Sequence, residues 1–67
     1  MNEDAFDMSV RKFLKKVGVT AQREIEQAVR DAEAAGTLKS AAMPAKATFT
    51  VGGVDVTFDI TGEIETG

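Results

Sequence analysis

Side chains that could do chemistry are few in this chain of 67 residues. It has no His, no Cys and no Tyr, so the commonest general bases, thiol nucleophiles and zinc ligands are missing. Two serines, Ser9 and Ser40, are present, but neither belongs to a recognisable pattern of nucleophile and general base. We therefore expect no enzyme activity, no catalytic residue and no cofactor.

Acidic residues at alternate positions near the C-terminus form the clearest polar pattern. They would share one face of a strand, with Thr57 among them. A hard cation needs several oxygens converging on one point, and these acids are spread along the chain, so we expect no metal site. The face has two interpretations, a docking surface for a basic partner or a solvated face that limits edge-to-edge aggregation. Its members are Asp55, Thr57, Asp59 and Glu63.

The charge balance argues against polyanionic partners. The net charge is −3, from 8 basic and 11 acidic residues. Residues 1–40 are balanced, so the whole deficit lies in residues 41–67. Binding to DNA or RNA normally depends on a basic footprint, and none is present. The run RKFLKK is best explained as the basic end of a helix, with Phe13 and Leu14 turned towards the core.

No stretch is apolar and long enough to span a bilayer, and we expect no signal peptide, because no basic segment is followed by an apolar stretch. We expect a cytoplasmic protein without a membrane partner. The length indicates one small domain covering residues 1–67.

The first half of the chain predicts two helices. Asn2 is a suitable N-cap, and apolar residues then recur at helical spacing until Gly18, which is typical of a helix end. Thr20 can cap a second helix that ends at Gly36. The expected helices span about residues 3–17 and 20–35.

The second half predicts an antiparallel β-hairpin over about residues 45–51 and 54–65. Apolar and polar residues alternate on both sides of Gly52-Gly53, and a two-residue glycine loop is a strong hairpin signal. That loop would place Val51 opposite Val54. Every apolar residue would then share one face, while Lys46 would pair with Asp59 on the other.

This pattern defines an α+β fold whose hairpin is too small to be stable alone. Either the helices cover its apolar face in a monomer, or a second copy adds strands. We expect the second arrangement, a homodimer with a four-stranded sheet formed by edge pairing or strand exchange. The expected core or dimer interface is Phe49, Val56, Phe58, Ile60 and Ile64.

The chain also resembles a family of very short bacterial proteins of unknown function. The segments that carry the resemblance are MNEDAF, RKFLKKVGVT and QREIE, together with the later PAKATFTVGGVDV and GEIE. The resemblance implies a stand-alone small domain that starts at Met1. It implies no activity, cofactor or site residue.

Two function classes follow from these observations. The first is a small protein-interaction or accessory module that acts as a homodimer, with another protein as a second candidate partner. The alternative is a helix-turn-helix-like nucleic-acid-binding protein, with its turn at Gly18 and Gln22, Arg23 and Gln27 exposed on the second helix. Glu24 stands where that motif expects a buried apolar residue, and the hairpin has the wrong charge for a wing. We therefore prefer the interaction module.

Overall fold

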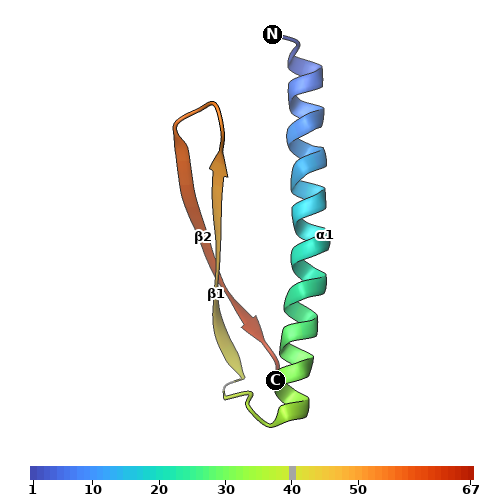
Figure 1. Cartoon of the computed structure of the whole chain (residues 1–67), viewed down its shortest axis with the longest axis vertical. Coiled ribbons are helices and arrows are strands. Elements are labelled where there is room, and N and C mark those ends of the chain that lie inside the picture. The colour runs from blue at the N-terminus through green and yellow to red at the C-terminus, as the bar shows by residue number, and fades with distance from the viewer. Residues whose placement is uncertain (40) are drawn as a thin grey trace.

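The computed structural model describes residues 1–39 and 41–67. One long helix, α1 (Glu3–Ala35), is followed by strands β1 (Ala42–Val51) and β2 (Val56–Glu65). The strands form an antiparallel hairpin that runs beside the helix, with its turn pointing towards the N-terminal end of α1 (Figure 1). The predicted α+β class is confirmed.

Both ends of α1 are capped as the sequence predicts. The Asn2 side chain accepts a hydrogen bond from the Ala5 N–H at 3.1 Å. At the other end Gly36 adopts the left-handed conformation, with φ at 74°. The N–H groups of Gly36 and Thr37 donate to carbonyls of the last turn at 3.1 and 2.9 Å. This is the Schellman arrangement, and it satisfies carbonyls that a helix end otherwise leaves unpaired.

The prediction of two helices is wrong, because α1 continues without interruption through Gly18 and Thr20. A glycine inside a helix costs only about 1 kcal/mol relative to alanine. No proline follows to break the hydrogen-bond ladder. Ala21 is also half-buried and continues the apolar face between the two predicted segments.

The apolar face of α1 keeps one phase across Gly18. Its members repeat with steps of four, three and four residues, which sum to an 11-residue period. Eleven residues make three turns at 3.67 residues per turn, close to the natural 3.6 of a helix, so the stripe stays almost straight along the axis. It comprises Val10, Leu14, Val17, Ala21, Ile25, Ala28 and Ala32.

The hairpin turn has four residues, 52–55, so the predicted two-residue turn at Gly52-Gly53 is wrong. A two-residue type I′ turn needs positive φ at both central positions. Of the two glycines only Gly53 has it, at 94°. The longer turn places Val51 opposite Val56 and moves every cross-strand pair by two positions.

A shift of two positions changes the partners but keeps every side chain that remains in a strand on its predicted face. Phe49 now pairs with Phe58, and their rings stack with centroids 5.3 Å apart. Asp59 pairs with Thr48, whose hydroxyl donates to the carboxylate at 2.7 Å, so the predicted pair of Lys46 with Asp59 is wrong. Stacked rings and a hydrogen bond across the strands favour this register.

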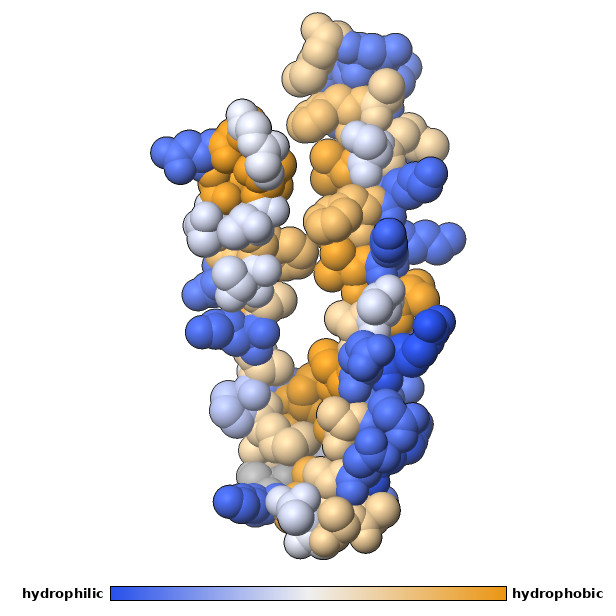
Figure 2. Space-filling view, in the orientation of Figure 1, coloured by the Kyte–Doolittle hydropathy of each residue, from blue (hydrophilic) through white to orange (hydrophobic). Residues whose placement is uncertain are grey.

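The molecule is elongated, with extents of 51 × 20 × 18 Å and a radius of gyration of 15.9 Å. A compact chain of this length would have a radius of about 11 Å. Among the described residues no side chain is fully buried. The helix and the hairpin therefore lie side by side without closing over a core (Figure 2).

Candidate interaction surface

The candidate surface consists of the two apolar faces that α1 and the hairpin turn towards each other. Apolar side chains gather on these facing sides, with an open hollow between them, while charged groups cover the outer side of the helix (Figure 2). The surface divides into two regions. The closed end lies near the α1–β1 connection and contains Ile25, Val29, Met43, Ala45 and Ile64. The open end lies near the hairpin turn and contains Val10, Phe13, Leu14, Phe49, Val51 and Phe58.

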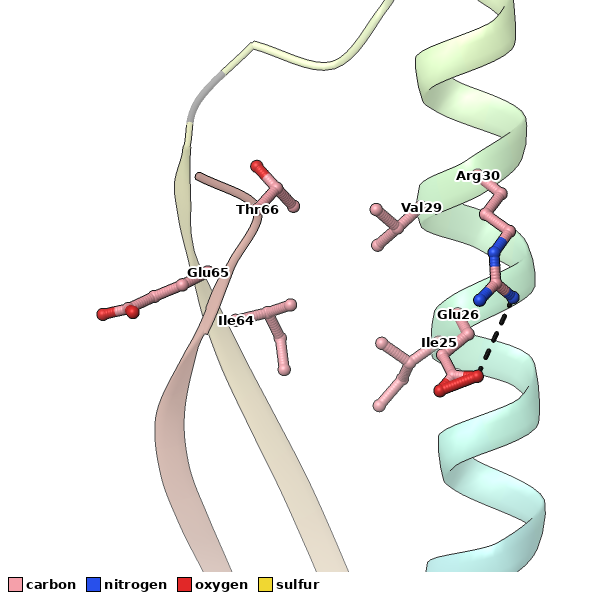
Figure 3. A pocket seen from close by; sticks show the side chains of 7 residues that line it. All are labelled: Ile25, Glu26, Val29, Arg30, Ile64, Glu65 and Thr66. Atoms are coloured by element: carbon pink, nitrogen blue, oxygen red, sulfur yellow. Dashed lines mark ion pairs between the residues drawn. The ribbon is translucent and has the colours of Figure 1, made fainter.

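At the closed end, side chains of the helix and the hairpin point towards one another. Ile25 and Val29 project from α1 towards Ile64 of β2, while Glu65 points away (Figure 3). Val29 and Ile64 are half-buried. Beside them Glu26 and Arg30 form an ion pair at 3.7 Å on the helix. This pair is exposed, so it supports the helix by a few tenths of a kcal/mol at most.

At the open end, apolar side chains line a cleft of about 380 Å³. Val10, Phe13 and Leu14 form the wall on α1, and three hairpin residues form the other wall. Phe13 remains 51% exposed. Exposed apolar groups that gather in one patch typically mark an interaction site, whereas single ones are normal on any surface.

The total surface shows how incompletely the chain is packed. The chain exposes 5914 Å². A compact monomer of 7.1 kDa would expose about 4,100 Å² by the usual scaling of surface with mass. The excess of about 1,800 Å² is roughly twice the 800 Å² that each partner contributes to a standard interface.

The predicted interface residues all lie on the apolar face of the hairpin. Phe49 and Ile64 are half-buried, whereas Val56, Phe58 and Ile60 are exposed. Within the described chain they have too little cover to form a core. Sequence reasoning missed Ala21 as part of the opposing stripe, although its 11-residue spacing from Val10 and Ala32 is visible in the sequence.

The predicted partner face is only partly assembled. Thr57, Asp59 and Glu63 lie on the polar face of β2. Asp55 belongs to the turn instead, because the turn is longer than predicted. Asp59 is held by the Thr48 hydroxyl, which fixes one carboxylate on this face.

The structure places the possible metal ligands and one of the two serines among the described residues. In this part of the chain no three His, Cys, Asp or Glu residues come together as a metal site would require. The Ser9 hydroxyl donates to the Phe6 carbonyl at 2.8 Å within the helix, and Ser40 lies outside the described residues. Along the same residues, no helix has the length and apolar character needed to cross a membrane. The chemistry that the surface supports is the burial of apolar area.

One helix, one hairpin and an uncovered apolar surface define an α+β protein of incomplete packing. By sequence, residues 1–67 match the model of DUF6494, a family of unknown function, and the chain belongs to that family. No curated protein and no solved structure matches the chain.

Proposed function

We propose that this protein is a small interaction or accessory module that acts as a homodimer. The observation that carries the proposal is the surface excess of about 1,800 Å² over a compact monomer, which is more than a standard interface requires. The uncovered area is apolar on both walls of the open end. A second copy supplies a matching apolar surface without any further component.

The outer sheet face remains available to another protein in such a dimer. Thr57, Asp59 and Glu63 point away from the apolar face, and their charge suits a basic partner. The alternative function, helix-turn-helix DNA binding, needs a turn at Gly18. Because α1 passes through that position, the motif has no corner and we do not propose it.

Sedimentation equilibrium across micromolar concentrations tests the dimer. The expected mass is twice 7.1 kDa. Leu14→Asp should shift the mass towards 7.1 kDa, because an unpaired charge buried in the interface costs about 3 kcal/mol or more, roughly a hundredfold in the dimer constant.

Val19→Asp is the matched control. Leu14 and Val19 are equally exposed in the chain, at 50% and 51%. Five residues separate them, which places Val19 about 140° further around the helix and away from the apolar stripe. Val19→Asp should leave the dimer intact. A wild-type mass of 7.1 kDa at all concentrations, or equal effects of the two substitutions with helical content unchanged, would contradict the proposal.

The partner face is tested separately with the double variant Asp59→Asn and Glu63→Gln. A protein that the wild-type dimer retains at low salt should be lost from the variant, provided that both sediment as dimers. Equal retention by wild type and variant would argue that these carboxylates only keep the surface solvated.

A further inference from the structure

We infer that two copies join through the free edges of their β2 strands, with Ile60 of one chain opposite Ile60 of the other. This inference rests on the proposed homodimer and names its interface. The product is a four-stranded antiparallel sheet in which the two β2 strands are central, with both helices on one side.

The hydrogen-bond pattern shows which edge is suited to pairing. Thr66 donates its N–H to the Ala41 carbonyl at 2.7 Å, and bonded and non-bonded pairs alternate from there along the hairpin. Pro44 therefore lies at a position whose backbone faces outwards, and it has no N–H to offer. The β1 edge is interrupted there. On β2, backbone groups face outwards without interruption at Thr57, Asp59, Thr61 and Glu63.

Charge disfavours the two registers next to this one in the β2 pair. With Ile60 on the two-fold axis, Asp59 lies opposite Thr61 and Thr57 lies opposite Glu63. A slip of one residue along each strand places Asp59 opposite either itself or Glu63, and like charges directly opposite are destabilising. The register centred on Ile60 avoids both pairings, and its one like-charge pair, Asp55 opposite Glu65, lies at the strand ends, where Asp55 belongs to the turn.

The same register also packs apolar side chains of the two chains against one another on the apolar face. Phe58 of one chain lies opposite Gly62 of the other, where a Cβ would meet nothing within 4 Å in the single chain. An aromatic ring beside a cross-strand glycine covers the backbone that the glycine leaves open. Val56 lies opposite Ile64, and Ile60, which is 57% exposed in the single chain, packs against its own copy.

The widths of the two layers agree with this arrangement. Adjacent strands are about 4.8 Å apart, so the centres of two paired hairpins lie about 9.6 Å apart. Packed helices have interaxial distances of about 8–10 Å. Because each α1 runs beside its own hairpin (Figure 1), on the side where the hairpin is apolar (Figure 2), pairing the hairpins brings the two helices to packing distance.

Single-cysteine variants test the register cleanly, because the chain has no native Cys. Residues opposite each other at a non-hydrogen-bonded position have Cα atoms about 4.5 Å apart, within the disulfide range. Ile60→Cys should therefore form a linked dimer under mild oxidation. Phe58→Cys lies on the same face but about 13 Å from its copy, and should link at least about tenfold more slowly. Ala47→Cys reports the β1 edge and should also link slowly.

Amide hydrogen exchange of the wild-type protein gives a second measurement that needs no substitution. The outward N–H groups of Thr57, Asp59, Thr61 and Glu63 should exchange at least about a hundredfold more slowly than those of Lys46, Thr48 and Thr50 on the β1 edge. Equal exchange at the two edges, or faster linking of Ala47→Cys than of Ile60→Cys, would overturn the β2 assignment. If sedimentation still gives a dimer in that case, self-association stands and only its geometry fails. A monomer would overturn both.

Discussion

The closed end and the open end have the same construction, one helix face against one sheet face, yet they differ in cover. At the closed end the facing residues include the small Ala28 and Ala45, and Val29 and Ile64 are half-buried. At the open end aromatic and branched residues line both walls of a cleft, and Phe13 is about half exposed.

This difference separates two sources of stability. The partial cover of Val29 and Ile64 at the closed end comes from within one chain, next to the short connection between α1 and β1. The exposed apolar groups at the open end would gain further cover from the second copy of the proposed dimer. The stability of the closed end should therefore not depend on protein concentration, whereas that of the open end should rise with concentration, as for any folded state that binds a partner.

Truncation of one side chain in each region is the strongest test of this contrast. If the proposed dimer forms, Phe13→Ala should lower its free energy of unfolding by about 3 kcal/mol, the usual cost for a buried phenylalanine. Val29→Ala should cost about 1 kcal/mol, because it removes two carbons from a half-buried site. Thermal unfolding at several concentrations measures both.

The two regions are distinguished by how the stability loss of each variant depends on protein concentration. The loss from Phe13→Ala should appear together with weaker association, whereas the loss from Val29→Ala should be the same at each concentration. A cost below about 0.5 kcal/mol for Phe13→Ala, typical of an exposed residue, would show that the open end is uncovered in solution.

Each region also ends at a glycine with positive φ, Gly36 beside the closed end and Gly53 beside the open end. Alanine at either position should cost about 1–2 kcal/mol, the penalty of left-handed backbone for a residue with a Cβ. Gly52→Ala is the control, because Gly52 lacks positive φ and a Cβ there meets nothing within 4 Å.

Denaturant unfolding of the three glycine variants gives these costs. A cost for Gly52→Ala equal to that for Gly53→Ala would favour the two-residue turn that the sequence suggests. It would contradict the four-residue turn and the pairing of Phe49 with Phe58 that follows from it.

The hairpin shows which features of a sheet can be predicted from the alternation of apolar and polar residues. Alternation assigned the faces correctly, because a shift of two positions preserves them. Alternation could not predict which residues pair across the strands, because the pairs Val51–Val54 and Val51–Val56 are equally apolar. Ring stacking of Phe49 on Phe58 distinguishes the registers, and that contact depends on geometry across the strands.

The helix shows the limit of local stop signals. Gly18 and Thr20 together resemble a helix end and a new N-cap. The free energy that one glycine costs is smaller than the stabilisation from an uninterrupted hydrogen-bond ladder and apolar stripe. Ala21 was the residue that could have indicated continuity. How the helix packs on the hairpin could not be predicted, because no period in the sequence records the distance between two elements.

Gly18→Ala tests that continuity with the smallest expected effect. Gly18 lies inside α1 between the open and the closed end, and a Cβ there meets nothing within 4 Å. Alanine should stabilise the helix by about 1 kcal/mol and raise Tm by about 4–8 °C for a chain of this size. If a helix ended at Gly18, the substitution would lower Tm instead, because alanine is disfavoured in the left-handed conformation typical of that position. A lower Tm with helical content unchanged would instead indicate that another backbone packs against Gly18 in the assembled protein.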